Sequence, residues 1–234
     1  MEEQKRIAAI LDKADELRRL RRRAIDRLDT LAQSIFYDMF GDPARSSDWP
    51  TVPVGEVTDC IVPGRDKPKS FSGTIPWITT GEISHLGVTF GSSAKLGLTN
   101  SEIEQVRARI VPANSVLMVC VGDLGSVSIA ETAMVINQQL HAFLCGEKIT
   151  AAYLMYALSH QEAYMRSRAT KTTLPYMNKS VCNSIPVPVP PLDLQHQFSD
   201  LFARISDRRT LLRSELLQRD LFASLQQRAF RGEL

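Results

Sequence analysis

Two long helical patterns, one at each end of the chain, limit the folds that this sequence can adopt. Residues 1–42 carry apolar side chains at alternating spacings of three and four, and Gly41 followed by Pro43 marks the expected helix end. Residues 192–231 carry a second such pattern, and Gly232 follows it. A helix of about 40 residues is roughly 60 Å long. We therefore expect two spacer helices, because a hairpin that only completes a core needs no such length.

Each helical pattern predicts an apolar seam that needs a partner. The seam of the first helix, which Arg21 interrupts, comprises Ile7, Ile10, Ala14, Leu17, Ala24, Leu28, Leu31 and Ile35. The second helix places on one side Phe198, Phe202, Ile205, Leu212 and Leu216. The two helices could pair with each other as an antiparallel coil, or with the same helices of a second chain.

The two helices also resemble each other in sequence, which indicates an internal repeat. The matched positions include Gln4 with Gln195, Arg18 with Arg209, Asp29 with Asp220, and Gly41 with Gly232. Any two amphipathic helices correlate to some extent, so chance agreement is the alternative. The common start and the common terminal glycine favour a true repeat that frames the residues between.

The residues between the helices contain more Gly, Pro, Ser and Thr. Short apolar runs bounded by Gly, Asn and Asp predict strands at 75–79, 115–121, 126–130 and 133–137. We expect a helix at 98–110, with a capping box formed by Ser101 and Glu104. A longer amphipathic helix is expected at 148–169.

The VPVPP segment at residues 187–191 is expected to form a stiff extended connector that cannot donate ladder hydrogen bonds. The predicted fold class is therefore α/β (α+β), with one mixed α/β domain at residues 43–186. A spacer helix at residues 1–42 precedes this domain, and a C-terminal spacer helix at residues 187–234 follows it.

The sequence contains no recognisable catalytic constellation. No G-x-G-x-x-G opens a helix, no P-loop is present, and the Asn/Asp-Pro-Pro-Tyr/Phe quartet of DNA amino-methyltransferases is missing. The segment from Gly122 to Gly125 predicts a hairpin turn, with a cofactor-binding loop as the alternative. His141 lies in a strand-like run, and we expect it to be structural rather than catalytic. We therefore predict a non-enzymatic chain with no catalytic residue and no cofactor.

Four cysteines are widely separated in the sequence: Cys60, Cys120, Cys145 and Cys182. They form no C-x-x-C pair and no histidine stands at metal-ligand spacing, so we expect reduced, buried thiols and no metal site. No apolar run suits a transmembrane helix and the N-terminus lacks a secretory signal, so we expect a cytoplasmic protein without membrane contact. The formal net charge of +2 neither requires nor excludes nucleic acid.

Several segments of the chain match a known family in their order. They are FGDP at 40–43, PWITTGEI at 76–83, GDLGSVSI at 122–129, INQQLHAF at 136–143, and IPVPVPPLDLQHQF at 185–198. With this order the chain resembles the specificity subunit of type I restriction–modification systems. In that family a target-recognition domain is followed by a helical spacer that opens with Pro-Pro-Leu-x-x-Gln. The corresponding residues here are Pro190, Pro191, Leu192 and Gln195.

The resemblance implies a DNA-recognition subunit without catalysis of its own, because methylation and cleavage belong to separate modification and restriction subunits. The implied partners are double-stranded DNA, modification subunits that dock on the helices and, through them, a restriction subunit. The usual family member carries two target-recognition domains, whereas this chain carries one between two spacers. The resemblance therefore implies a half-subunit that forms a homodimer, or pairs with a second half, and reads one half of a bipartite target.

Two basic segments are the candidate DNA contacts. The first interleaves cations with polar groups: Arg166, Arg168, Lys171, Thr172, Thr173, Tyr176, Asn178 and Lys179. Its alternative is a solvated loop in which the two arginines serve a helix C-terminal dipole. The second segment carries Arg65, Lys67 and Lys69 in a loop with Gly and Pro, and an ordinary surface loop is the alternative.

Polar side chains near the predicted strands are candidate base contacts. Thr79, Thr80 and Glu82 follow one strand, and Glu82 could accept from a cytosine amine or cap a turn. The run of three amides from Asn137 to Gln139 could bond adenine or form a buried turn. The arginines at 18–23 stand among acids, so we favour a protein-contact role for them. The rival functions are a stand-alone DNA methyltransferase and a coiled-coil scaffold that never contacts DNA.

Overall fold

A computed structural model describes residues 2–45, 48–64 and 66–230 of the chain. Within the two long helices, the described side chains are those of residues 12–13, 15–40 and 192–213. The chain divides into two compact units, one of Met1–Ser34 with Leu201–Leu234 and the other of Ile35–Asp200. We call the first the helical unit and the second the globular unit.

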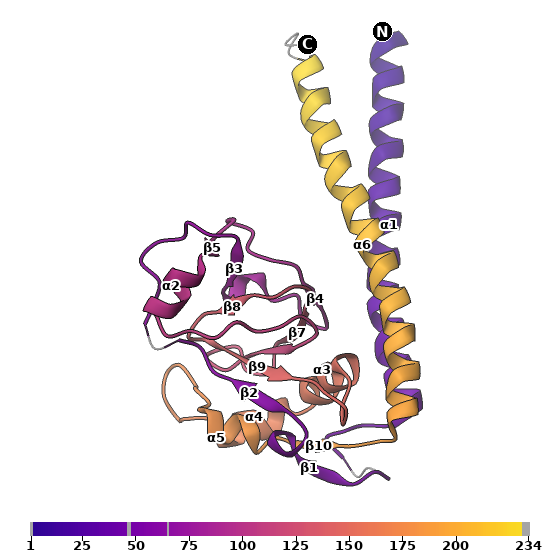
Figure 1. Ribbon diagram of the computed structural model, residues 1–234. Coiled ribbons are helices and arrows are strands. Elements are labelled where there is room, and N and C mark those ends of the chain that lie inside the picture. Colours follow the sequence, from indigo (N-terminus) through magenta and orange to yellow (C-terminus); the bar gives the residue numbers. More distant parts are fainter. Residues whose placement is uncertain (1, 46–47, 65, 231–234) are drawn as a thin grey trace. The chain divides into compact units, whose positions relative to one another are not determined.

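The helical unit is built from two long helices, as the sequence predicts. The first, α1, spans Glu2–Phe40 and the last, α6, spans Leu192–Phe230, each 39 residues long. The parts of these helices within the unit run antiparallel beside each other (Figure 1). Nη1 of Arg209 on α6 donates to Oδ1 of Asp29 on α1 at 2.8 Å. The antiparallel pairing that the seams allow is therefore present within one chain.

The end of α1 follows the prediction, because Gly41 adopts a left-handed φ of +74° and donates its N–H to the Tyr37 carbonyl at 2.9 Å. The predicted seam is borne out only in part where side chains are described. Leu17, Ala24, Leu28 and Ile35 are half-buried and Leu31 is 47% exposed, whereas Ile25 and Ala32 are buried more deeply. Ile25 and Ala32 are seven residues apart, and so are Ala24 and Leu31. The heptad spacing alone therefore could not show which of the two pairs is buried. The remaining predictions concern side chains that the structure does not describe, those of Ile7, Ile10, Ala14, Leu216 and Asp220, and Gly232 lies outside the described residues.

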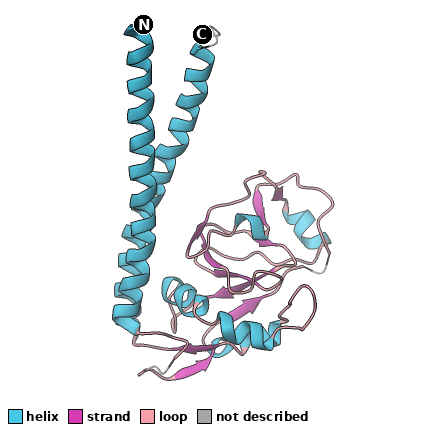
Figure 2. Ribbon diagram, turned by 180° about the vertical axis from the view of Figure 1, so that it is seen from behind, coloured by secondary structure: helices cyan, strands magenta, loops and turns pink. Residues whose placement is uncertain are grey.

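The globular unit contains three sheets, drawn in magenta in Figure 2. The largest has the strand order β2-β9-β6-β7-β4, a second has the order β5-β3-β8, and the third pairs β1 with β10. The strands are β1 Thr51–Pro53, β2 Asp59–Ile61, β3 Ile75–Ile78, β4 Gly87–Thr89, β5 Gly97–Leu98, β6 Val116–Val119, β7 Val127–Ala130, β8 Val135–Ile136, β9 Leu140–Leu144 and β10 Pro186–Pro188. The strands predicted from the four apolar runs are confirmed as β3, β6, β7 and β8.

Among the described residues of the globular unit are four short α-helices and two 3-10 helices. The α-helices are α2 Asn100–Gln105, α3 Ala151–Ser159, α4 Glu162–Arg168 and α5 Lys179–Asn183, and the 3-10 helices are Val54–Glu56 and Thr80–Glu82. Helix α3 packs against β6, β7 and β10. The predicted hairpin turn joins β6 to β7, and Gly122 and Gly125 adopt φ values of +84° and +88° there. No helix among the described residues is long and apolar enough to cross a membrane.

Two predicted helices differ in the structure. The capping box of α2 is formed by Thr99 and Glu102 rather than by Ser101 and Glu104. The Thr99 hydroxyl accepts from the Glu102 N–H, and the Glu102 carboxylate accepts from the Thr99 N–H. The helix predicted at 148–169 is two helices, α3 and α4, that are separated near His160. Nδ1 of His160 lies 2.8 Å from the Tyr156 carbonyl and occupies this end of α3.

The proline-rich connector also differs, because residues 186–188 form β10, which pairs antiparallel with β1. The Val189 N–H donates to the Pro50 carbonyl at 2.9 Å. The prediction that this segment cannot donate ladder hydrogen bonds was therefore wrong. Proline lacks an N–H, but the valines that alternate with the prolines retain theirs.

An aromatic cluster joins both helix ends to the core within the globular unit. Phe36 and Phe198 lie with their ring centroids 5.3 Å apart, and Tyr156 lies 5.2 Å from both rings. The Tyr153 hydroxyl donates to the Pro188 carbonyl at 2.7 Å, which ties the same cluster to β10. The first residues of α6 are thus held by packing and by hydrogen bonds together.

The amide of Gln195 explains the Pro-Pro-Leu-x-x-Gln pattern in physical terms. Its Nε2 donates to the Pro190 carbonyl at 2.9 Å, and its Oε1 accepts from the Thr150 N–H at 2.9 Å. The Gln195 side chain is fully buried. Its amide therefore makes the hydrogen bonds to the Thr150 N–H and the Pro190 carbonyl that water would otherwise make.

Gln195→Ala is expected to lower the free energy of unfolding by about 1–3 kcal/mol, because it leaves a buried N–H and a buried carbonyl without partners. Urea denaturation of the full chain measures this difference. Gln197→Ala is the matched control, because Gln197 is exposed on the same helix and should change stability by less than about 0.5 kcal/mol. Equal losses in the two variants would contradict the role given to Gln195.

Candidate nucleic-acid interface

The parallel pairing of β3 with β8 brings two polar segments to one edge. Ile78 pairs with Ile136, so both strands end at the same level, and the Asn137 N–H donates to the Ile78 carbonyl at 2.9 Å. Thr79 and Asn137 therefore begin neighbouring segments at the carboxyl ends of these strands. Two groups of predicted base contacts, remote in sequence, are adjacent in the structure.

The Thr79 segment is internally bonded. Oε2 of Glu82 accepts from the Thr79 N–H at 2.9 Å and from its hydroxyl at 2.6 Å, which forms a capping box of the short helix Thr80–Glu82. Oε1 of Glu82 also accepts from the Ser93 hydroxyl at 3.3 Å. The turn-capping role weighed for Glu82 is thus present, and Thr80 lies half-buried in the same turn.

The amide run at 137–139 links both basic segments. Nε2 of Gln138 donates to the carbonyls of Gly64 and Asp66, each at 3.2 Å, so it anchors the first basic loop. The Gln139 carbonyl accepts from the Cys120 N–H at 2.8 Å, at the end of β6. This turn therefore stands between the loop at residues 64–70 and the end of β6.

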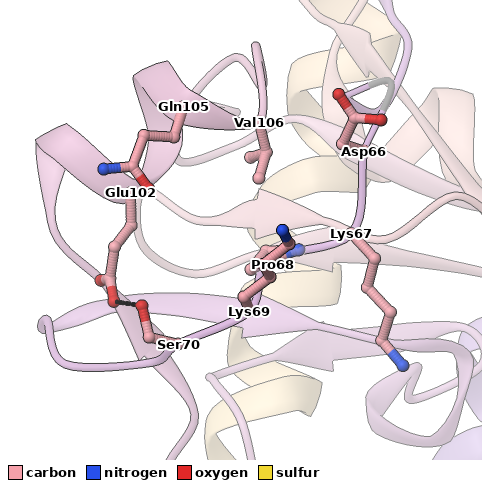
Figure 3. A pocket seen from close by; sticks show the side chains of 8 residues that line it. All are labelled: Asp66, Lys67, Pro68, Lys69, Ser70, Glu102, Gln105 and Val106. Carbon is pink, nitrogen blue, oxygen red and sulfur yellow. Dashed lines mark hydrogen bonds between the residues drawn. The ribbon is translucent and has the colours of Figure 1, made fainter.

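The loop at 64–70 borders a pocket of about 420 Å³. Figure 3 shows Glu102 and Ser70 on one side of this pocket, and Asp66 and Lys67 on another. Lys67 and Lys69 are exposed, and both line the pocket. Arg65, the third predicted cation of this loop, lies outside the described residues.

Glu102 holds the shape of this pocket wall. Its carboxylate accepts from the Ser70 hydroxyl at 2.5 Å, from the Ser72 hydroxyl at 3.0 Å and from the Thr99 N–H at 2.8 Å. These hydrogen bonds, that of Ser70 first, lower the pKa of Glu102 to about 2, so the carboxylate is charged at neutral pH. Glu102 is not among the site residues predicted from the sequence, although Thr99-x-x-Glu102 is itself a capping-box pattern.

The second basic segment begins with two arginines that have partners within the chain. Nε of Arg166 lies 2.6 Å from Oε1 of Glu162, one helical turn earlier. The Arg168 guanidinium lies 5.5 Å from the centre of the Tyr164 ring. Both arginines stand in the last turn of α4, where their positive charge interacts favourably with the C-terminal end of the helix dipole. This is the alternative role weighed for them from the sequence.

The backbone of the loop that follows α4 turns back on itself before α5 (Figure 1). The Thr170 N–H donates to the Tyr176 carbonyl at 3.0 Å, and the Thr172 hydroxyl donates to the Leu174 carbonyl at 2.8 Å. The predicted contacts that this loop exposes are Lys171, Thr172, Thr173 and Tyr176. We call residues 170–176 the recognition loop.

The recognition loop is anchored to the end of β6. The Gly122 N–H donates to the Pro175 carbonyl at 2.9 Å, and the Met177 N–H donates to the Cys120 carbonyl at 3.0 Å. Asn178 caps α5 by accepting from the Val181 N–H, and the exposed Lys179 begins that helix. The end of β6 thus contacts the recognition loop and the 137–139 turn.

The amino-acid sequence matches a known family. Residues 46–219 match the model of the type I restriction modification DNA specificity domain. This match covers well over half of the 234 residues, and the chain therefore belongs to that family. The family resemblance inferred from the sequence is confirmed.

Two curated relatives from Methanocaldococcus jannaschii carry the same description. The chain is 21% identical to the type I restriction enzyme MjaIX specificity subunit over 156 residues, which cover 66% of this chain and 36% of the relative. It is 26% identical to the MjaVIII specificity subunit over 165 residues, which cover 67% of this chain and 35% of the relative. The matched part thus spans about a third of the length of these relatives.

Solved structures share the fold. The HsdS subunit from Thermoanaerobacter tengcongensis matches with a TM-score of 0.57 at 22% identity, covering 100% of this chain and 59% of that one. The S subunit of a type I restriction–modification system from M. genitalium matches with a TM-score of 0.67 at 15% identity, covering 96% and 59%. The mixed α/β unit with two long helices is therefore the fold of specificity subunits.

Proposed function

We propose that this chain recognises a DNA sequence through the edge at which β3, β8 and β6 end. The observation that carries the proposal is the placement of two exposed basic loops around one polar turn. Lys67 and Lys69 lie on the loop that Gln138 anchors, and Lys171 lies on the recognition loop that the end of β6 anchors. Cations positioned beside polar groups can hold phosphates while neighbouring side chains reach base edges.

The predicted DNA-contact side chains at this edge fall into two groups: those that already have a partner within the chain, and those that are exposed on the recognition loop. Glu82, Arg166 and Arg168 already have intramolecular partners, so they are suited to shape the surface. The exposed Lys171, Thr173 and Tyr176 project from the recognition loop and are the side chains that we assign to DNA contact. Losing a base-reading side chain would cost about 1–3 kcal/mol at one base pair only.

The long helices support the second half of the proposal, in which they set the spacing of recognition units and seat modification subunits. Methyl transfer and cleavage then belong to those partner subunits, and this chain reads one half of a bipartite target. Two such chains related by a two-fold axis would read an interrupted palindrome, because an isologous assembly repeats the half-site in inverted order.

Lys171→Ala is expected to reduce the slope of log affinity against log salt by about 0.9 for duplex DNA, since one phosphate contact is lost. Fluorescence anisotropy of a labelled duplex over a salt series measures this slope, with the chain bound to its modification subunits. Lys148→Ala is the matched control, because Lys148 is an exposed lysine of the globular unit, outside both basic loops, that donates to the Glu56 carbonyl and should leave the slope unchanged.

Two results would contradict the proposed function. The absence of salt-dependent DNA binding, even beside the modification subunits, would favour the scaffold interpretation. Transfer of a methyl group from S-adenosylmethionine to DNA by this chain alone would favour the methyltransferase interpretation.

A further inference from the structure

Three side chains that are distant in sequence meet beneath the recognition loop. Cys120, His141 and Cys182 each offer one ligand atom, and these atoms lie within 4.8 Å of one another. All three residues are buried, with exposed fractions of 1%, 4% and 0%. The expectation that no histidine stands at metal-ligand spacing rests on the sequence alone, and the fold brings His141 beside Cys120 and Cys182.

The strand register explains why these side chains meet. Met118 on β6 pairs with His141 on β9, and Cys120 follows Met118 by two residues, so Cys120 and His141 face the same side of the sheet. Cys60 on β2 pairs with Phe143, two residues after His141, and therefore faces this side too. Cys182 reaches the same group from α5.

The geometry suits a thiophilic ion. The Sγ atoms of Cys120 and Cys182 lie 3.7 Å apart, and two thiolates bound to tetrahedral zinc at about 2.3 Å lie roughly 3.8 Å from each other. A second observation is that Nδ1 of His141 is buried and has no hydrogen-bond partner among the described residues. A buried imidazole nitrogen without a partner is costly, and coordination by that atom would satisfy it.

We propose that Cys120, His141 and Cys182 bind a zinc ion, and that Cys60, which faces the same side of the sheet but lies outside this group of three, moves in as the fourth ligand. Three cysteines and one histidine form a common ligand set of closed, structural zinc sites. The ion would cross-link β2, β6, β9 and α5. Because α5 directly follows the recognition loop, and Met177 is bonded to Cys120, the ion would fix the base of that loop. This inference does not depend on DNA binding.

Cobalt(II) added to the metal-free full chain is expected to bind in one equivalent and to produce thiolate-to-cobalt charge-transfer absorbance, which zinc then displaces. Cys182→Ser and His141→Gln are expected to weaken cobalt binding by more than about 100-fold, since even outer-shell substitutions cost 10–100-fold. Cys145→Ser is the matched control, because Cys145 lies outside the cluster, and it should bind like the wild type.

A measurement on the wild type alone keeps the test independent of how the variants fold. Zinc at about 100 times its dissociation constant should raise the melting temperature by roughly 5–10 °C, and a chelator should reverse this rise. Absence of cobalt binding by the reduced wild type, or equal weakening by Cys145→Ser, would overturn the site. A Cys120–Cys182 disulfide in protein purified without reductant would likewise overturn it, and full affinity in Cys60→Ser would remove the fourth ligand.

Discussion

Gly73→Ala is expected to destabilise the globular unit by more than about 3 kcal/mol. A Cβ atom at this position would lie 2.0 Å from the carbonyl carbon of Leu98 and 2.1 Å from the Thr99 nitrogen. Both are backbone atoms, so no change of rotamer can relieve the clash, and the two segments must separate. Their separation would break the hydrogen bond from the Gly73 N–H to the Gly97 carbonyl, which is 3.0 Å long. Such a backbone effect belongs to the severe class of substitutions.

Chemical denaturation of the full chain measures this loss. Gly146→Ala is the control, because a Cβ atom there meets nothing within 4 Å and the change should stay within about 0.5 kcal/mol. Gly73 also lies close to the pocket wall, since Ser72 and Thr99 both donate to Glu102. A Gly73→Ala protein as stable as Gly146→Ala would show that the approach of these segments is looser than described.

Phe198→Ala is expected to lower the free energy of unfolding by about 3–5 kcal/mol. The ring is 1% exposed and lies between Phe36, Phe40 and Tyr156, at centroid distances of 5.2–5.8 Å. Its removal leaves a cavity that these rigid rings cannot fill, so the cavity term adds to the lost transfer energy. The loss should appear as a lower denaturant midpoint and a lower melting temperature.

Phe90→Ala provides the comparison for Phe198→Ala, because it deletes the same side chain at a position that is 56% exposed. We expect it to change stability by less than about 0.5 kcal/mol. Similar losses in both variants would mean that the aromatic cluster does not hold the helix ends to the core as we describe.

The elements that local patterns could predict are those with clear ends or clear apolar runs. Gly41 ends α1 because only glycine adopts a positive φ at little cost, and that signal is visible in sequence. The runs around β6 and β7 were also predictable, because glycines at 122 and 125 mark the turn between them. Seven consecutive buried residues, Ala152–Leu158, made α3 a helix whose faces are all covered, and periodicity could not show where it ends.

The features that could not be predicted depend on contacts between distant segments. The hydrogen bond by which Gln138 anchors the 64–70 loop joins residues more than 70 positions apart in the sequence. The hydrogen bond between Glu102 and Ser70 joins residues about 30 positions apart. The meeting of Cys120, His141 and Cys182 follows from strand register and from the placement of α5, neither of which leaves a local signal. The base contacts proposed for the recognition loop stay a prediction, because exposure alone does not identify a partner.

The antiparallel course of α1 and α6 returns the polypeptide to the end of the helical unit from which it set out (Figure 1). A peptide joining Phe230 to Glu2 of the same chain would therefore connect two helix ends that lie at one end of the helical unit. The same proximity makes a circularly permuted chain, closed at this end and opened in an exposed loop, a feasible design.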